Sequence, residues 1–284
     1  MRIAVLGASG VIGRTLLPLL AQRGHAVRAG AHAASSVQGL RAAGVEAAAC
    51  DILDAASLAP LLAGCDAVIN VATSIPKPGG RGDWALNDRI RVEGTRNLLA
   101  ACAQAGVPRL VAQSVAMLLC ADDSRAQTEE DPVVGYGRVA TAAQLEEQVR
   151  ASGLDWRIAR GGLFYGAGRE EAWRTQLDDP AFRIPAGGKA WLSQVHVRDY
   201  AGALVHIVEL ETPRQVYNAC DDAPLTELDL YREAAQWQGK PVPAVGEAPG
   251  PYGLRSFRVS NAKLRATGWV PQYPTLREGL QSLA

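Results

Sequence analysis

MRIAVLGASGVIGRTLLPLLAQRG, residues 1–24, is the stretch that decides the fold. Its apolar run from Ile3 to Leu6 predicts a buried parallel strand, and the leucines that follow lie on one side of a helix that ends at Gly24. Between them, three glycines let the backbone turn tightly and approach a pyrophosphate, which the free N–H groups of the helix N-terminus attract. Strand, turn and helix in this order predict a dinucleotide site, formed by Gly7, Ser9, Gly10, Val11, Ile12 and Gly13.

Composition sets bounds on the class of protein and its partners. The chain has 284 residues, of which 48% are hydrophobic, so it can bury a large core. Lys plus Arg number 29, as do Asp plus Glu, so no net charge favours nucleic acid or a membrane as a partner. The first residues already form a strand and no apolar run reaches transmembrane length, so we expect a cytoplasmic protein. The five cysteines include no Cys-x-x-Cys pair, so we expect reduced thiols and no metal site.

Strand-like and helix-like segments alternate as far as residue 160. Apolar runs that predict strands occur at 26–30, 45–49, 66–71, 108–113 and 155–160, and helical patterns at 57–63, 87–105 and 136–151. This alternation predicts an α/β fold with a Rossmann-type doubly wound parallel sheet, whose ligand lies beyond the carboxyl ends of the strands. We expect a dinucleotide-binding domain at 1–164, to which 191–219 return, and a smaller C-terminal substrate-binding part made of 165–190 and 220–284.

The residues that follow the next strands predict how the cofactor is held. The second strand ends at His32 without the carboxylate that an NAD-selective site commonly places there. His32, the neighbouring serines and Arg14 would suit a 2′-phosphate, which favours NADP and leaves NAD possible; a solvated turn is the alternative. After the third strand, Asp51 and Ile52 are expected to bracket the adenine. After the fourth, Val71, Ala72 and Thr73 are expected to line the ribose and phosphates.

Further motifs along the whole chain resemble the extended or atypical branch of the short-chain dehydrogenase/reductase superfamily, the epimerase/dehydratase-like group. Besides the glycine loop they are DAVINVA (66–72), VEGTRNL (92–98), RGGLFYG (160–166), VHVRDYA (195–201), VYN (216–218), LRATGW (264–269) and EGL (278–280). The resemblance implies the family's fold and NAD(P) binding. Its motifs are less specific for one reaction.

The resemblance also implies catalytic residues, with departures from the family's pattern. In the family, a Lys four residues after a Tyr lies on the same helix face, lowers the pKa of the Tyr and holds the nicotinamide ribose. Here Tyr136 is present and Ala140 stands at the Lys position. The family's Ser or Thr corresponds to Val115 or, if the alignment shifts by one residue, to Ser114. Arg91 stands where the family often has Asn. Tyr136 and Ser114 are therefore the expected catalytic residues of a reduced set.

A catalytic tyrosine needs a nearby positive charge to exchange protons near neutrality. Arg138 points away from Tyr136 on the helix, so we also consider a cation from the C-terminal part. His196 is expected to be structural. Gly161, Gly162 and Leu163 resemble the family's segment that passes the nicotinamide, where Tyr136 would also contact the cofactor.

The sequence is compatible with three functions. The first is an NAD(P)-dependent oxidoreductase or isomerase that transfers hydride on a small carbonyl, alcohol or alkene substrate. The second is a non-catalytic NADP-binding protein with a structural or redox-sensing role, which the loss of Lys at Ala140 favours. The third is a nucleotide-sugar epimerase or dehydratase. The expected partners are a small-molecule substrate and, at most, a second copy of the chain, because helices 87–105 and 136–151 are those that pair in dimers of the resembled family.

Overall fold

The computed structural model describes residues 1–76, 83–121, 124–168, 170–248 and 255–283. The chain forms two compact units. The first unit consists of 1–114, 140–159 and 201–216, and the second of 115–139, 160–200 and 217–284. The second unit thus includes 115–139 and 160–164, which the sequence pattern assigns to the dinucleotide-binding domain.

A seven-stranded sheet confirms the predicted Rossmann-type fold. Its order is β10-β6-β5-β4-β1-β2-β3, and the pairs from β3 through β5 are parallel. The chain starts at β1, moves outward through β2 and β3, and then crosses back to place β4 on the other side of β1. This reversal is the point where ligands bind in such sheets. The strands are β1 (Arg2–Leu6), β2 (Ala26–Ala31), β3 (Glu46–Ala49), β4 (Ala67–Asn70), β5 (Arg109–Val115), β6 (Asp155–Gly161) and β10 (Gln215–Ala219).

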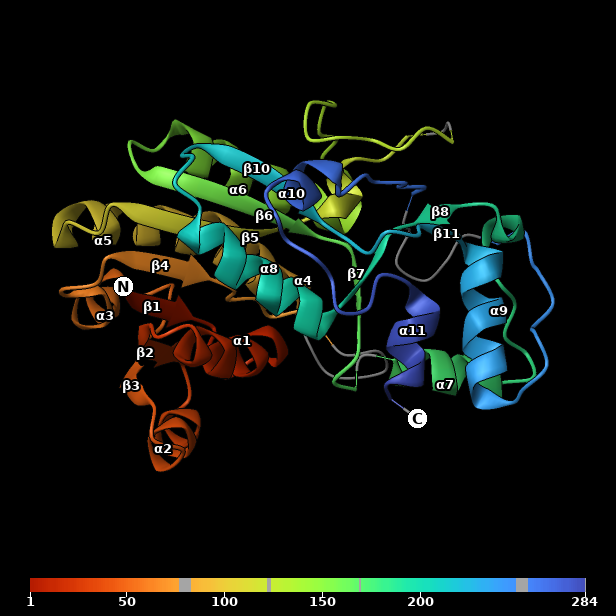
Figure 1. Ribbon diagram of the computed structural model, residues 1–284, viewed down its shortest axis with the longest axis horizontal. Helices are drawn as coiled ribbons and strands as arrows, with labels where there is room; N and C mark the ends of the chain where they lie inside the picture. Colours follow the sequence, from red (N-terminus) through yellow and green to blue (C-terminus); the bar gives the residue numbers. More distant parts are fainter. Residues whose placement is uncertain (77–82, 122–123, 169, 249–254, 284) are drawn as a thin grey trace. The chain divides into compact units, whose positions relative to one another are not determined.

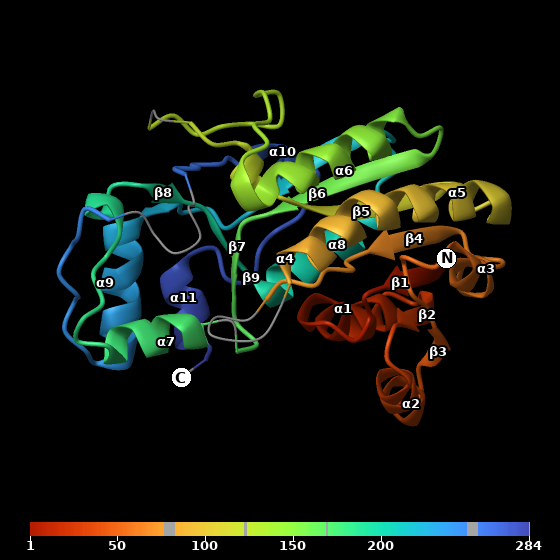
Figure 2. The ribbon, with the colours of Figure 1, turned by 180° about the vertical axis from the view of Figure 1, so that it is seen from behind.

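Helices cover both faces of the sheet. Figures 1 and 2 show α1 and α8 on one face and α5 and α6 on the other. The helix expected at 87–105 is divided, because a π-helical turn, η1 (Ile90–Gly94), joins α4 to α5. The helices are α1 (Val11–Gln22), α2 (Ala34–Ala42), α3 (Ala55–Leu62), α4 (Trp84–Arg89), α5 (Thr95–Ala105), α6 (Ala140–Ala151) and α8 (Val197–Glu209).

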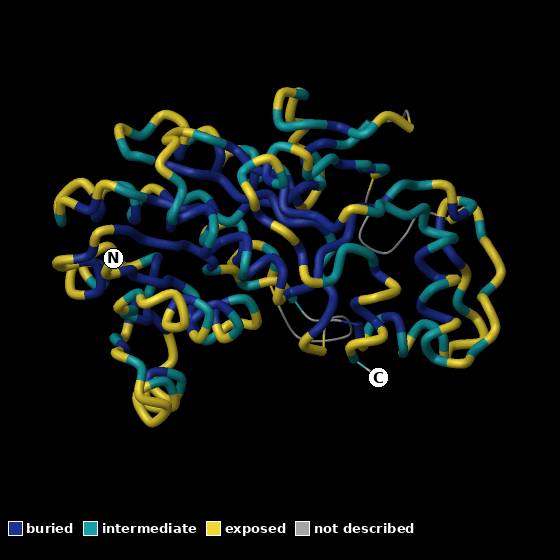
Figure 3. Tube along the Cα trace, viewed as in Figure 1, coloured by how far each residue is buried: buried dark blue, intermediate teal, exposed yellow. Residues whose placement is uncertain are grey.

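The core of the first unit follows from the apolar patterns of these elements. Leu61 of α3, Leu98 of α5 and Val149 of α6 are buried in one cluster with side chains of the sheet. The central strands are buried along almost their whole length (Figure 3). A rigid sheet therefore fixes the loops that leave its carboxyl ends.

The second unit has its own small sheets and core. β7 pairs parallel to β9, and β8 pairs antiparallel to β11. Trp173, Tyr231 and Phe257 lie in its buried cluster. Its elements are η2 (Ala116–Leu118), η3 (Gly137–Val139), β7 (Leu163–Tyr165), α7 (Glu171–Asp178), η4 (Ala186–Gly188), β8 (Trp191–Leu192), β9 (Gln194–His196), β11 (Leu225–Thr226), α9 (Glu227–Gln238), α10 (Ala262–Ala266) and α11 (Leu276–Gln281).

Two further observations bear on the sequence-based expectations. Among the described helices, none has both the length and the apolar character needed to cross a membrane. All five cysteines are unpaired thiols.

Candidate functional site

The glycine loop joins β1 to α1 as expected. Gly10 is the N-cap of α1, and its N–H donates to the carbonyl oxygen of Gly7 at 3.0 Å. Within the described part of the chain, no side chain caps this helix, and its first turn contains no acidic residue. Its first N–H groups therefore offer partial positive charge to an anion such as a pyrophosphate.

Gly7 and Gly13 make the turn compact. Gly7 has a φ of +77°, and a Cβ there would lie 2.8 Å from the backbone of Ala72. A Cβ at Gly13 would lie only 2.4 Å from the carbonyl oxygen of Gly7. A larger residue at either position would force the turn open, so this loop fits the pyrophosphate of a dinucleotide.

The ends of β2 and β3 bring His32 close to a carboxylate. His32 is largely exposed, and its Nε2 lies 3.5 Å from Asp51 Oδ2 on the neighbouring strand end. The other oxygen of Asp51 accepts a hydrogen bond from the N–H of Leu53 at 2.9 Å. The sequence pattern did not reveal this proximity, because it depends on the pairing of two strands. An imidazole and a carboxylate therefore lie side by side at the ends of β2 and β3.

The segment after β4 passes beside the glycine loop. The N–H of Val71 donates to the carbonyl oxygen of Leu6 at 3.1 Å, and that of Ala72 to Asn70 Oδ1 at 3.1 Å. Val71 is buried, whereas Thr73 is exposed. These residues thus leave the sheet next to Gly7, where the predicted cofactor site lies.

Ser114 makes a buried contact with α6. Its hydroxyl donates to Glu146 Oε1 at 2.7 Å, and the two residues are 3% and 1% exposed. Arg150, one turn along the helix, lies 3.5 Å from the other oxygen of Glu146. Ser114 therefore ties β5 to α6 through Glu146. Its catalytic role stays a prediction.

Tyr136 has a cationic partner in the second unit. Its phenol oxygen accepts a hydrogen bond from the backbone N–H of Arg255 at 3.2 Å, and the Arg255 guanidinium lies 5.7 Å from the ring centre. This distance is within the range of cation–π attraction. Burial raises the pKa of Tyr136, whereas the N–H and the charge of Arg255 lower it. The sequence analysis considered a cation from the C-terminal part near Tyr136 without identifying it, and Arg255 is such a cation.

Arg91 contacts the first turn of α6. Its Nη1 donates to Thr141 Oγ1 at 3.4 Å, and Thr141 Oγ1 donates to Asp88 Oδ1 at 2.7 Å. Thr141 directly follows Ala140 in α6. The guanidinium of Arg91 is buried, which lowers its pKa, and the charge of Asp88 opposes that shift. The contact with Thr141 and Asp88 thus joins η1 and the end of α4 to the start of α6.

The segment around the end of β6 is closely packed within the second unit. A Cβ at Gly161 would lie 2.6 Å from the ring of Phe164, and one at Gly162 would lie 2.5 Å from the carbonyl oxygen of Ser193. The N–H of Leu163 donates to that same carbonyl at 2.8 Å. The glycines are therefore required by packing, and the contact of this segment with a nicotinamide stays a prediction.

His196 has the surroundings of a structural histidine. Its Nδ1 accepts a hydrogen bond from the N–H of Arg198 at 3.1 Å, and its ring packs edge-on against Tyr165 and Tyr273. Burial, the main cause, lowers the pKa of His196 to about 4. Asp199 accepts hydrogen bonds from two backbone N–H groups at residues 272 and 273. These contacts support packing.

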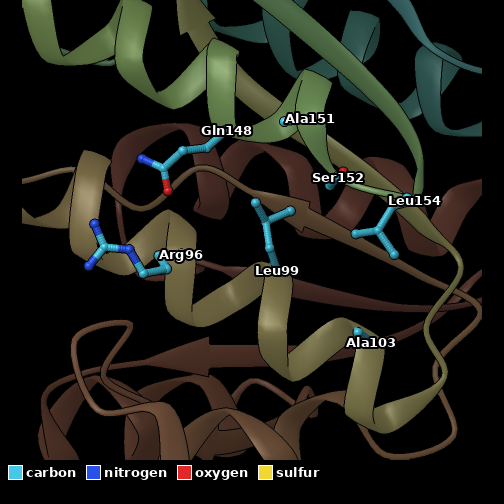
Figure 4. Close-up of a pocket in the computed structure, with 8 residues that line it drawn as sticks. Arg96, Leu99, Ala103, Gln148, Ala151, Ser152 and Leu154 are labelled. Carbon is cyan, nitrogen blue, oxygen red and sulfur yellow. The ribbon is translucent and has the colours of Figure 1, made fainter.

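A groove of about 670 Å³ lies between α5 and α6 (Figure 4). Arg96, Leu99 and Ala103 come from α5, and Gln148 and Ala151 from α6. None of the expected site residues lines it. These are the helices for which the family resemblance predicts pairing in a homodimer, and that pairing stays a prediction. Among the described residues, no cluster of three or more His, Cys, Asp and Glu side chains could hold a metal ion.

Comparisons with known proteins identify the family of the chain. A sequence model of a family described as NAD(P)H-binding matches residues 7–208. The chain is 30% identical over 309 aligned positions to a 3-diazoavenalumate denitrifying reductase from a Streptomyces species, with 99% of each chain covered. It is also 30% identical to a 4-hydroxy-2-methyl-3-oxo-4-farnesyl-3,4-dihydroquinoline-1-oxide ketoreductase from Stigmatella aurantiaca, over 98% of this chain and 85% of the relative.

Solved structures show the same fold. A dTDP-glucose 4,6-dehydratase from Streptomyces venezuelae, crystallised with NAD, superposes with a TM-score of 0.84 at 24% identity. The match covers 99% of this chain and 95% of that one. At this identity the likeness concerns the fold alone.

Proposed function

The chain belongs to the NAD(P)H-binding family, within the extended or atypical short-chain dehydrogenase/reductase group, and we propose that it is an NADP-dependent reductase of a small carbonyl compound. The observation that carries the proposal is the contact of Tyr136 with Arg255 in a chain whose glycine loop fits a dinucleotide. Two relatives at 30% identity are named as reductases, one of them a ketoreductase, which supports reduction of a carbonyl group.

Tyr136 is the proposed proton donor. Because burial raises its pKa, the phenol is protonated near neutrality and able to donate to a substrate oxygen. In this reaction the carbonyl carbon would accept a hydride, which NADPH would supply when bound. The proton of Tyr136 passes to the carbonyl oxygen, which completes an alcohol, and the N–H and guanidinium of Arg255 stabilise the negative charge left on the phenolate.

The loop residues bind and orient the cofactor in this proposal. The uncapped N-terminus of α1 takes the pyrophosphate, and the backbone beside Gly7 positions the adjacent ribose. Positioning alone provides a large part of the rate of a hydride transfer, so a reduced catalytic set is compatible with turnover.

NADP is the proposed form of the cofactor because His32, not a carboxylate, directly follows β2. Asp51 is the opposing charge, 3.5 Å from His32. Titrations of NADPH and NADH should therefore show tighter binding of NADPH. Asp51→Asn should increase the NADPH preference, and His32→Ala should reduce it. A preference for NADH that neither substitution changes would contradict this choice.

Oxidation of NADPH against a panel of ketones, aldehydes and activated alkenes tests the reaction. We expect turnover with a carbonyl class and a loss of about a hundredfold or more in Tyr136→Phe. Tight cofactor binding without oxidation by any class would instead favour the non-catalytic NADP-binding protein, which the alanine at residue 140 motivates. Conversion of a nucleotide sugar without net consumption of cofactor would favour the epimerase.

A further inference from the structure

The second unit pairs the chain segment that leads to Tyr136 with the segment that follows Arg255. The N–H of Gln127 donates to the carbonyl oxygen of Arg258 at 2.7 Å, and the N–H of Ser260 donates to the carbonyl oxygen of Gln127 at 2.8 Å. These two hydrogen bonds enclose a parallel β-bridge. Because Arg255 stands only three residues before Arg258, the bridge limits how far the backbone of Arg255 can move.

Glu129 links this bridge to the end of β10. Its Oε1 accepts a hydrogen bond from the backbone N–H of Asn218 at 2.7 Å, and the Asn218 side chain donates to the carbonyl oxygen of Ser260 at 3.2 Å. Ser260 in turn donates to Gln127, which stands two residues before Glu129. The contacts therefore form a closed ring, to which the segment that leads to Tyr136 contributes one side chain, the Glu129 carboxylate.

The carboxylate of Glu129 is partly buried and faces positive charges. Burial raises the pKa of Glu129, whereas the N–H of Asn218 and the charges of Lys263 and Arg160 lower it. A carboxylate that gives up water needs donors and opposite charges of this kind. Its removal would leave the N–H of the fully buried Asn218 without this acceptor, so the segment would lose its anchor at β10.

We propose that Glu129 is a positioning residue of the proposed reductase, which holds Arg255 against Tyr136. It acts through the bridge between Gln127 and Arg258 and not by contact with the phenol. The hydrogen bond from Arg255 to the phenol is 3.2 Å long, so a shift of about 0.4 Å is enough to break it. The inference rests on the proposed function, because it explains how the proton donor keeps its cationic partner.

The titration of Tyr136 reports this role before any substrate is known. Burial raises the pKa of Tyr136 and the N–H and charge of Arg255 lower it, so a variant that displaces Arg255 should raise it further. We expect Glu129→Ala to raise the pKa of Tyr136 at least as far as Arg255→Ala, which keeps its backbone N–H. Glu129→Gln keeps an oxygen that can accept from Asn218 and should titrate like the wild type. The measurement is the tyrosinate absorbance of the full-length chain that is lost in Tyr136→Phe.

Two further measurements separate positioning from a general effect on the fold or on cofactor binding. With a carbonyl substrate, the kcat of Glu129→Ala should fall about tenfold or more while the Kd for NADPH is unchanged, because the glycine loop lies in the first unit. Glu130→Ala is the matched control. It removes the neighbouring carboxylate, which is exposed and lies 4.0 Å from Lys263, and should leave both the titration and kcat unchanged.

Each other result has a definite meaning. An unchanged titration in Glu129→Ala, or an equal shift in Glu130→Ala, overturns the inference and leaves the proposed function standing. A shift in Glu129→Gln as large as in Glu129→Ala also overturns it, because the acceptor for Asn218 is then not the anchor. If Glu129→Ala shifts the titration but the wild type oxidises NADPH with no carbonyl class, the proposed function is overturned instead. Should thermal unfolding show that Glu129→Ala does not fold, Glu129→Asp, whose carboxylate is withdrawn by one methylene group, takes its place with the same expectation.

Discussion

Replacing Gly13 by Ala should impair both the fold and cofactor binding. The added methyl carbon would lie 2.4 Å from the carbonyl oxygen of Gly7 and 2.6 Å from Cα of Ala8. Carbon–oxygen contacts are normally no shorter than about 3.3 Å, so the backbone must open by about 0.9 Å. Both neighbours are backbone atoms, so no flexible side chain can yield. We expect a cost of about 3 kcal/mol, at the upper end of typical overpacking costs.

That cost is measurable in two assays. Each kcal/mol lowers the Tm of a chain of this size by about 2–4 °C, so Gly13→Ala should melt about 6–12 °C lower. The opened turn also displaces the N-terminus of α1, so the Kd for NADPH should rise at least about tenfold. Gly39→Ala is the matched control. It lies in α2, has no atom within 4 Å of its added Cβ, and should leave Tm and Kd unchanged or raise Tm slightly. Wild-type Kd and Tm in Gly13→Ala would refute the reasoning.

Three further substitutions test individual contacts. Burial lowers the pKa of His196 from 6.5 to about 4, so the unfolded chain takes up a proton first as the pH falls. The stability that this group contributes is therefore lost below about pH 6.5. Between about pH 7 and about pH 5, the free energy of unfolding in urea should fall by about 2 kcal/mol less in His196→Asn than in the wild type. Ser114→Ala should lower the free energy of unfolding in urea by about 1–3 kcal/mol, because buried Glu146 loses one hydrogen-bond donor. Unchanged stability would contradict the contact. The kcat of this variant, measured below its melting range, tests the catalytic prediction separately. Arg255→Ala keeps the backbone N–H and removes the charge, so it should raise the pKa of Tyr136. The titration of Tyr136 can be followed as the part of the tyrosinate absorbance that is lost in Tyr136→Phe. A titration in Arg255→Ala identical to that of the wild type would exclude an effect of the charge.

The fold was predictable because its signals are local. The apolar run before Gly7, the glycine spacing and the helical leucines all lie within one strand-turn-helix unit, and alternation along the chain then indicates a parallel sheet. The division of helix 87–105 by η1 was not predictable. A π-helical turn has hydrogen bonds between residues i and i+5, whereas an α-helix has them between i and i+4. The spacing of apolar residues does not reveal where this change occurs.

The candidate site was predictable only where it consists of backbone. The residues at strand ends follow from topology, because parallel strands place their carboxyl ends together. The partners of individual side chains do not follow from topology. The contact of His32 with Asp51 depends on strand pairing, and that of Ser114 with Glu146 depends on how α6 packs on β5. Each partner comes from an element distant in sequence, where no local pattern records it.

The lysine that is missing at residue 140 shows which positive charge the chemistry requires, but not which residue of the chain supplies it. In the resembled family, one lysine both tunes the tyrosine and holds the nicotinamide ribose. In this chain, Ala140 stands at the lysine position, and Arg255 contacts Tyr136. If Arg255 performs only the first of these roles, its two effects are separable. Arg255→Ala should change the titration of Tyr136 and leave the Kd for NADPH unchanged, because the contact of Arg255 is with the phenol. A substitution that changes both would mean that one cation performs both roles, as the lysine does in the family.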